Sequence, residues 1–185
     1  FDCQLTVKIE TLNPIRSFKG RGAEMFISQA APDEPIVCAS AGNFGQAMAY
    51  ACQKKKIPLT VFASKNANTY KIEMMRSFGA TVILMGEDFD EAKIIAKAHA
   101  KKLQLRFVED SQDIETLAGA GTIGLELLNL PYSLDALLIS LGNGALLGGI
   151  GRVIKELSPQ TELIAVQSEG APAMIESIRS QKLIS

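Results

Sequence analysis

Along the chain, short apolar runs alternate with longer segments in which apolar residues recur at helical spacing. The short runs are bounded by turn-forming residues and are too short for helices, so the pattern predicts strands. The predicted strands cover residues 5–10, 36–39, 59–63, 81–85, 106–109, 135–140 and 162–167. The predicted helices cover residues 18–29, 44–55, 70–78 and 89–103, followed by a long helix to about Leu128, a helix to Leu157 and one from about Ala171.

The first predicted strand differs from the others. Residues 5–10 alternate apolar and polar side chains, which is typical of a strand with one buried face. The later strands are nearly continuous apolar runs, as strands buried on both faces are. Strands that alternate with longer helices indicate a parallel sheet covered on both faces. The sequence therefore predicts a protein of the α/β class.

Composition and charge exclude several classes of protein. The chain has 185 residues, of which 47% are hydrophobic, enough for one sizeable core or two small ones. Its net charge of -1 gives no basic surface for nucleic acid, so we expect no nucleic-acid partner. No apolar run approaches the roughly 18 residues that a membrane helix needs, so we expect no membrane partner.

The N-terminus and the cysteines bear on cellular location. Residues 1–3 show neither a secretory signal pattern nor an initiating methionine, so we expect the natural chain to begin earlier. Cys3, Cys38 and Cys52 are odd in number and widely spaced, which fits neither a disulfide framework nor a metal-binding pattern. We therefore expect buried, reduced thiols in a cytoplasmic protein, and no metal site.

One lysine lies in a stretch that could support covalent chemistry. Residues 17–23 read Ser-Phe-Lys-Gly-Arg-Gly-Ala, which places Lys19 at or near the first turn of a predicted helix. A lysine amine that has lost its proton is a nucleophile and can form a Schiff base with an aldehyde. Phe18 could supply an apolar wall, and the two glycines would allow a cofactor to approach. The alternative is a solvated lysine in a surface turn.

Two later loops follow predicted strands and begin predicted helices, which is where parallel sheets bind ligands. In residues 40–43, Ser-Ala-Gly-Asn, small side chains would expose backbone N–H groups to a carboxylate or phosphate, although plain helix capping is the alternative. In the glycine-rich residues 142–149, successive N–H groups would form a nest that suits a phosphate. The glycine spacing of this loop, with Glu169 beyond the next strand, leaves a dinucleotide site open as an alternative.

A cofactor that carries both an aldehyde and a phosphate would use all three stretches, and pyridoxal phosphate has that pair of groups. With residues 17–23, 40–43 and 142–149 in this order, the chain resembles the fold-type II pyridoxal-phosphate enzymes, above all the threonine dehydratase and serine racemase group. Further matches in order and spacing extend the resemblance over essentially the whole chain: Lys71 and residues 78–80, 118–122 and 169–172.

The resemblance implies a fold of two three-layer, parallel-sheet domains, like the β subunit of tryptophan synthase, with pyridoxal 5'-phosphate between them. Residues 1–35 and 118–185 would form a large domain, and residues 36–117 would form a small mobile one. Members of this family continue well beyond the point where this sequence stops, so we expect the C-terminal part of the large domain to be missing. We also expect a homodimer or a higher homo-oligomer.

The resemblance also implies roles for individual residues. Lys19 would form the Schiff base and remove the Cα proton of the substrate, Phe18 would contact the cofactor ring, and Asn43 would hydrogen-bond the 3-hydroxyl oxygen of the cofactor. The substrate carboxylate would lie against Ser40, Ala41, Gly42 and Asn43. The cofactor phosphate would lie against Gly142, Asn143, Gly144, Ala145 and Leu146.

The chain departs from the family pattern at several of these positions. Asn143 and Ala145 interrupt a loop that is usually four glycines, and an alanine with positive φ would cost about 1 kcal/mol or more. Ala41 replaces a serine that racemising members use on the opposite face of the substrate, which favours elimination over racemisation. Phe44 stands where many dehydratases have histidine.

We therefore expect a pyridoxal-phosphate-dependent ammonia-lyase, or dehydratase, that converts threonine or serine to a 2-oxo acid and ammonia. Its partner would be a small amino-acid substrate. The nearest alternative is a serine racemase or a β-replacement enzyme of the same fold. A non-catalytic amino-acid-binding homologue and a dinucleotide-binding oxidoreductase domain are the alternatives outside these classes.

Overall fold

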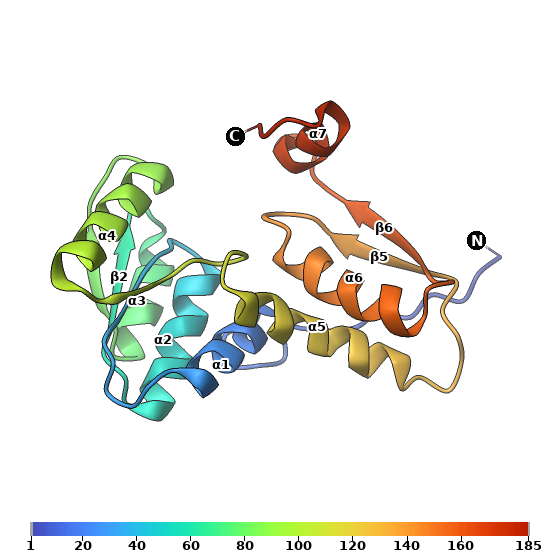
Figure 1. Cartoon of the computed structure of the whole chain (residues 1–185), viewed down its shortest axis with the longest axis horizontal. Helices are drawn as coiled ribbons and strands as arrows, with labels where there is room; N and C mark the ends of the chain where they lie inside the picture. The colour runs from blue at the N-terminus through green and yellow to red at the C-terminus, as the bar shows by residue number, and fades with distance from the viewer. Residues whose placement is uncertain (1, 185) are drawn as a thin grey trace.

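The structure, a computed structural model, contains two parallel β-sheets with helices packed against them (Figure 1). It describes residues 2–184, so the terminal residues 1 and 185 of the predicted large domain lie outside the described part. The strands are β1 (Ile36–Ala39), β2 (Leu59–Ala63), β3 (Thr81–Leu84), β4 (Arg106–Val108), β5 (Ala136–Ser140) and β6 (Glu162–Val166). The helices are α1 (Lys19–Gln29), α2 (Asn43–Lys55), α3 (Thr69–Ser77), α4 (Phe89–Leu103), α5 (Ile114–Leu128), α6 (Ala145–Leu157) and α7 (Ala173–Ser180). The predicted α/β class is confirmed.

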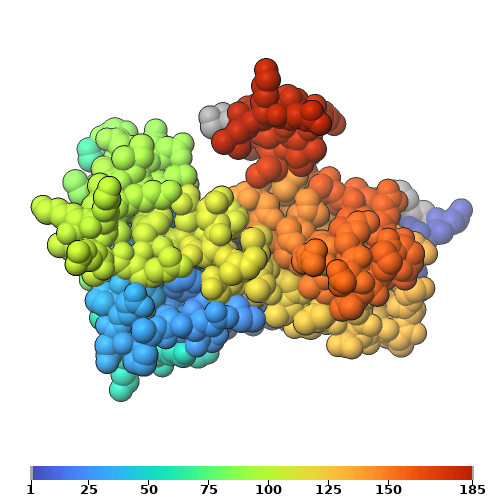
Figure 2. Space-filling model, viewed as in Figure 1, coloured from blue at the N-terminus to red at the C-terminus, as the bar shows by residue number. Residues whose placement is uncertain are grey.

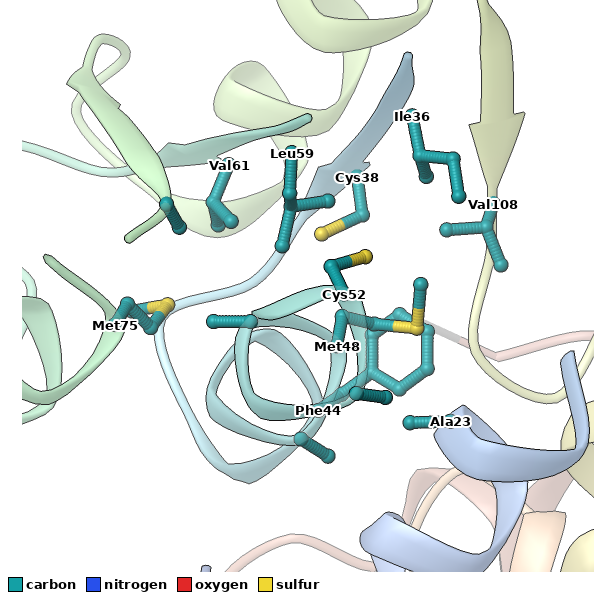
Figure 3. Close-up of a cluster of buried hydrophobic side chains, with 14 of the residues drawn as sticks. Ala23, Ile36, Cys38, Phe44, Met48, Cys52, Leu59, Val61, Met75 and Val108 are labelled. Atoms are coloured by element: carbon teal, nitrogen blue, oxygen red, sulfur yellow. The ribbon is translucent and has the colours of Figure 1, made fainter. Parts of the chain in front are cut away.

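A four-stranded parallel sheet, in the order β3-β2-β1-β4, organises one half of the molecule. Successive side chains of a strand point to opposite faces, and both faces of this sheet are covered. Val37 of β1 packs with Phe62 of β2 and Ala96 of helix α4. Cys38, the next residue of β1, points the other way and belongs to the cluster that contains Met48 of helix α2 (Figure 3). The sheet is therefore a buried middle layer between α4 and α2.

Helix α1 joins this half of the molecule to the other. Ala23 and Ile27 are buried on its inner face and belong to the same apolar cluster as helix α2. Elsewhere along α1, glycines let it approach α5 closely: a Cβ built on Gly119 would lie 2.3 Å from the carbonyl oxygen of Arg21. The first turn of α1, where Lys19 lies, is therefore held by packing against two helices.

Strands β5 and β6 form a separate two-stranded parallel sheet, with helices against only one of its faces. Ile123 of α5, Ile139 of β5 and Ile150 of α6 share one apolar cluster on the covered face. Leu138 and Val166 are 69% and 50% exposed. Helix α7 follows this sheet and projects from the body of the molecule, and none of its residues is buried (Figure 2). This half of the molecule is therefore less completely packed.

The strand predicted over residues 5–10 is wrong, because none of the strands in residues 2–184 includes this segment. Leu5 and Val7 are 80% and 70% exposed, and the Thr6 hydroxyl contacts the Tyr132 hydroxyl at 2.9 Å. An alternating pattern describes a segment with one apolar face, but a strand also needs a neighbour that supplies backbone hydrogen bonds. The described part of the chain provides no such neighbour for this segment.

The predicted division into domains stays a prediction. One feature of the packing bears on it directly: the apolar cluster beneath the four-stranded sheet crosses the predicted boundary between residues 35 and 36. Ile15 and Phe26, from before this boundary, share that cluster with Ile36 and Met48 from after it. Any movement of the predicted small domain would therefore have to take helix α1 with it or break this contact.

The cysteines differ from one another in their surroundings. Cys38 and Cys52 are buried, whereas Cys3 is exposed, contrary to the expectation that all three are buried. Burial raises the pKa of the Cys38 thiol far above its ordinary value and raises the pKa of the Cys52 thiol to about 12. The two core thiols therefore stay protonated at neutral pH and pack as small apolar groups. Among the helices of residues 2–184, none combines the length and apolarity that a bilayer span requires.

Candidate active site

Lys19 is the first residue of helix α1, where the sequence predicts it. The turn before it is held by Asn13, whose Oδ1 accepts hydrogen bonds from the backbone N–H groups of Ile15 and Ser17 at 3.2 and 3.3 Å. The Lys19 side chain is only 14% exposed, and its Nζ lies 4.8 Å from the centre of the Phe18 ring. The alternative of a fully solvated surface lysine does not fit this burial.

Two polar side chains from distant parts of the chain meet the Lys19 amine. Its Nζ lies 2.5 Å from Oδ2 of Asp110, which follows strand β4, and 3.3 Å from Oδ1 of Asn143, which follows strand β5. Asn143 in turn donates a hydrogen bond from Nδ2 to the same Asp110 oxygen at 2.7 Å. The structure therefore brings the predicted reactive lysine and the predicted phosphate loop together, through a carboxylate that the sequence analysis did not single out.

The glycine-rich loop begins helix α6 with backbone amides that precede the first helical hydrogen bond. Gly144 has a left-handed backbone with φ of +92°, whereas Ala145 is already the first residue of the helix. The alanine that interrupts the usual glycines therefore carries no backbone strain. The first helical hydrogen bond runs from the Gly148 N–H to the Gly144 carbonyl at 2.8 Å, so the amide of Leu146 precedes it and has no partner within the helix. Such amides, with the helix dipole, suit an anion.

The loop after β1 is partly explained by its own hydrogen bonds. Ser40 is only 7% exposed, and its Oγ accepts hydrogen bonds from the backbone N–H groups of Gly42 and Gly45 at 3.2 and 2.9 Å. The Ser40 hydroxyl therefore caps backbone N–H groups at the start of helix α2, which is the alternative considered for this loop. Ala41 is half-buried and packs against the apolar cluster beneath the sheet.

Asn43 begins helix α2 and exposes its amide. Its Oδ1 accepts a hydrogen bond from Nζ of Lys71 at 2.7 Å, and the same Nζ donates to Oε1 of Gln46 at 3.1 Å. The lysine occupies the acceptor of the Asn43 amide and leaves its NH₂ group as the available donor. The hydrogen bonds of residues 2–184 do not join Asn43 to Lys19. Phe44 points into the core, away from this surface (Figure 3).

Asp110 is the functional candidate that the sequence analysis missed. It lies two residues beyond the end of β4, at the edge of the sheet where the loops after parallel strands gather. That position was the available signal, because the strand over residues 106–109 was predicted correctly to within one residue. A neighbouring acidic residue, Asp113, precedes helix α5 and instead accepts a hydrogen bond from the backbone N–H of Glu109 at 2.7 Å.

Arg21 lies two residues after Lys19 but has a structural role. Its guanidinium contacts Glu10 at 2.7 Å and Glu126 at 2.6 Å, so it ties the N-terminal segment and helix α5 to helix α1. The hydrogen bonds that Glu126 accepts from Arg21 and Lys8 lower the pKa of its carboxyl to about 2. A cavity of about 850 Å³ adjoins this network and includes neither Lys19 nor the two predicted loops.

The chemistry of the site follows from the groups that converge there. A part-buried amine lies beside the N-terminus of a helix, and a Cβ built on Gly142 would meet nothing within 4 Å, so the loop is open to a ligand. Side chains and amides of this kind fit a ligand that carries both a phosphate and an aldehyde. On a fold of parallel sheets, they form a candidate site for a phosphorylated aldehyde cofactor.

Comparison with known proteins identifies the cofactor. The family model for pyridoxal-phosphate dependent enzymes matches residues 1–184, and the chain belongs to this family. The predicted cofactor, pyridoxal phosphate, and the predicted resemblance are thereby confirmed. A biosynthetic L-threonine dehydratase of Halalkalibacterium halodurans is 37% identical over 191 residues, a match that covers all of this chain and 46% of that enzyme.

Two solved structures are similar to the chain in fold. The processed form of threonine deaminase isoform 2 from Solanum lycopersicum is 30% identical with a TM-score of 0.89, over 96% of this chain and 52% of that one. Serine racemase from Dictyostelium discoideum is 28% identical with a TM-score of 0.86, over 94% of this chain and 58% of that one. The chain therefore spans about half the length of the relatives that it matches.

Proposed function

We propose that the chain is part of a pyridoxal-phosphate-dependent ammonia-lyase that converts threonine or serine to a 2-oxo acid and ammonia. The observation that carries the proposal is the Lys19 amine, part-buried and 3.3 Å from Asn143 in the glycine-rich loop. The relative named L-threonine dehydratase, which matches along the whole chain, supports this reaction over others of the family.

In the proposed mechanism, the helix α6 N-terminus binds the cofactor phosphate through the amides around Leu146. Phe18 forms an apolar wall beside the amine. Asn43 would donate a hydrogen bond from its NH₂ group to the cofactor, because Lys71 occupies its amide oxygen. Lys19 would hold the cofactor through its aldehyde group, and its free amine would remove the Cα proton of the substrate. Pyridoxal phosphate, when bound, supplies the ring that delocalises the charge left by that proton.

The substrate carboxylate is proposed to lie against the loop that begins helix α2. The first hydrogen bond of this helix runs from the Gln46 N–H to the Gly42 carbonyl, and the Gly45 N–H is bonded to Ser40, so the amides of Asn43 and Phe44 are the ones that would suit an anion. Ser40 holds the loop in shape through Gly42 and Gly45, so its contribution would be to geometry more than to direct contact. Ala41 has no proton to transfer, which supports chemistry on one face of the substrate only.

Borohydride trapping and a turnover assay test the proposal together. The chain is mixed with pyridoxal phosphate, reduced with borohydride and mapped by mass spectrometry; we expect the adduct on Lys19. With threonine or serine, we expect 2-oxo acid, and Lys19→Ala should abolish it. Lys65→Ala, at an exposed lysine that pairs with Glu87, is the matched control and should leave turnover unchanged. Turnover that survives in Lys19→Ala would contradict the proposed role of this amine.

Racemisation is the second candidate function, because a serine racemase is among the structural neighbours at 28% identity. A racemase must deliver a proton to the second face of the substrate, and the residue expected there is Ala41. Chiral analysis of serine recovered from the reaction separates the two functions. We expect the recovered serine to keep its configuration, and restoring the hydroxyl with Ala41→Ser should raise any racemisation relative to elimination.

We further propose that residues 36–117 form a small mobile domain against a large domain of residues 1–35 and 118–185. The separate apolar cluster beneath β5 and β6 supports two units. Amide hydrogen exchange with and without pyridoxal phosphate tests it. Protection that changes only in the loops between the two sheets would support this division, whereas uniform change across α1 and α2 would oppose it.

We propose a homodimer or higher homo-oligomer that works in the cytoplasm on a small amino acid. Exposed apolar side chains on the two-stranded sheet, such as Leu138, support an association between chains or with further protein. Sedimentation equilibrium of the chain measures the oligomeric state directly. A monomer at all concentrations would reject the first part of this proposal.

A further inference from the structure

Asp110, Lys19 and Asn143 form a closed triangle of side chains. Asp110 Oδ2 lies 2.5 Å from Lys19 Nζ and 2.7 Å from Asn143 Nδ2, and the third side, from Lys19 Nζ to Asn143 Oδ1, is 3.3 Å. The three residues come from the start of α1, the loop after β4 and the loop before α6. The two charged side chains of the triangle are 14% and 17% exposed, so water screens their attraction only in part.

Asp110 contributes little to the fold around it. Within residues 2–184, its side chain bonds to the two site side chains alone, whereas Asp113, three residues later, binds a backbone N–H and the Arg106 guanidinium. The second oxygen of Asp110, Oδ1, is buried without a hydrogen-bond partner among residues 2–184. A buried acceptor without a partner is destabilising. Local stability therefore does not explain why a carboxylate occupies this position.

The carboxylate acts on both anchors of the proposed cofactor site. It holds the Lys19 amine, and it accepts from the Asn143 NH₂ group, which turns Asn143 Oδ1 toward Lys19 and the backbone N–H of Ala145. The pKa of the Cys38 thiol is raised mainly by burial, and the electrostatic effects of Cys52 and the Asp110 carboxylate raise it further. An amine held as an ammonium in an ion pair has no lone pair with which to attack an aldehyde.

We propose that Asp110 is a positioning residue that holds the Lys19 amine against the glycine-rich loop and must release it before the amine can bond to pyridoxal phosphate. The inference rests on the proposed function. Once Asp110 has released the Lys19 amine, its nitrogen forms a C=N bond with the aldehyde carbon and the C=O bond breaks. The oxygen leaves as water with two protons of the amine. The additional proton of the ammonium passes to solvent. Asp110 thereby sets how fast the chain takes up its cofactor.

The first test measures the rate of cofactor uptake. Pyridoxal phosphate is mixed rapidly with the chain, and the visible absorbance of the C=N bond is followed over time. Asp110→Asn removes the charge and keeps the shape of the side chain. We expect cofactor uptake to be about tenfold faster, because the amine no longer has to break one charge-assisted hydrogen bond. Glu109→Gln is the matched control, because the neighbouring Glu109 pairs with Lys93 and Lys97 on helix α4; it should leave the rate unchanged.

The second test needs no cofactor. The chain is methylated with formaldehyde and borohydride, and mass spectrometry follows the modification of Lys19 relative to Lys65, whose partner Glu87 is unaffected. Asp110→Asn should raise the relative reactivity of Lys19 by a similar factor. Asp110→Ser provides a second variant without the charge, in case the asparagine variant does not fold.

The outcomes separate the two proposals. If borohydride traps no cofactor on Lys19 in any variant, the proposed function fails and this inference with it. If the cofactor is trapped on Lys19 but uptake and methylation in the Asp110 variants are equal to wild type or slower, the inference is overturned while the proposed function stands. Faster uptake together with higher Lys19 reactivity, in either folded variant, supports it.

Discussion

The two sheets of this molecule differ in how completely helices cover them. The four-stranded sheet is buried between α4 and α2, and both Val37 and Cys38 of its central strand β1 are fully buried. The two-stranded sheet has one covered face, and on β5 Leu138 stays 69% exposed beside the buried Ile139. The proposed site takes Lys19 and Asp110 from around the first sheet and Asn143 from the second.

This difference indicates which half of the described chain is the more completely packed. The first sheet has a core of its own, so it can hold the loops after β1 and β4 in place. The second sheet holds the glycine-rich loop from one face only, and the relatives are about twice as long as this chain. The proposed cofactor site therefore lies between the four-stranded sheet, which is covered on both faces, and the two-stranded sheet, which is covered on one.

The largest effect should come from the core of the four-stranded sheet. Phe62 is 2% exposed and packs between β1 and helix α4, so Phe62→Ala should lower the free energy of unfolding by about 3–5 kcal/mol. The same kind of change on the open face, Leu138→Ala, should alter it by about 0.5 kcal/mol or less. Urea unfolding measures both. Equal losses would remove the contrast between the two sheets.

The contact between helices α5 and α6, beside the two-stranded sheet, should be the next most sensitive. A Cβ on Gly149 of helix α6 would lie 2.3 Å from the carbonyl oxygen of Leu117 in α5, so Gly149→Ala must push these helices apart. We expect a loss of about 2–3 kcal/mol in the free energy of unfolding, the range for overpacked cores. Gly170→Ala, where the nearest atom is 3.8 Å away, is the control and should change little. A neutral Gly149→Ala would show that the contact between α5 and α6 adapts easily.

Before helix α6 begins, the glycine-rich loop should respond at Gly144 but not at Gly142. Gly144 has φ of +92°, so Gly144→Ala should lower the free energy of unfolding by about 1–2 kcal/mol. Gly142→Ala has open space and no positive φ, and we expect a change below about 0.5 kcal/mol. Thermal and urea unfolding without cofactor measure both. Equal sensitivity at the two positions would mean that the loop needs glycine throughout, as the family pattern suggests.

The smallest effect should come from the ion pairs that tie the N-terminal segment to α1 and α5. The pKa of Glu126 is lowered from 4.5 to about 2, so its contribution is present above pH 4.5 and disappears as the pH falls toward 2. The side chain is 47% exposed, which limits this contribution to about 0.5 kcal/mol. Urea unfolding of Glu126→Gln against wild type should show the difference at pH 7 and lose it near pH 2. A difference that grows in acid would have the wrong sign.

Much of the fold could be predicted because each helix or strand is determined largely by the pattern of residues within its own segment. Six of the seven predicted strands and all seven helices appear within one or two residues of their predicted bounds. The exception, residues 5–10, shows the limit of such patterns. Alternation identifies an apolar face, but whether another strand pairs with it depends on residues far away.

The candidate site could be predicted in part for the same reason. Lys19, Asn43 and the glycine-rich loop lie at strand ends and helix starts, positions that a coarse reading of the elements already locates. The contact between Asp110 and Lys19 could not be predicted, because the two residues are 91 positions apart in the chain. The sequence also could not show whether Ala145 needs a positive φ. In the structure it is the first residue of helix α6 and therefore has no left-handed conformation.

The sequence by itself determined the α/β class, the order of elements and the residue types available for an amine and phosphate site, because periodicity, turn chemistry and motif spacing act over a few neighbouring residues. The tertiary structure decided which of these groups meet. It paired Lys19 with Asp110 and Asn143, assigned Ser40 to capping and left residues 5–10 without a strand partner. Those outcomes depend on how the helices pack between the two sheets, which no local pattern encodes.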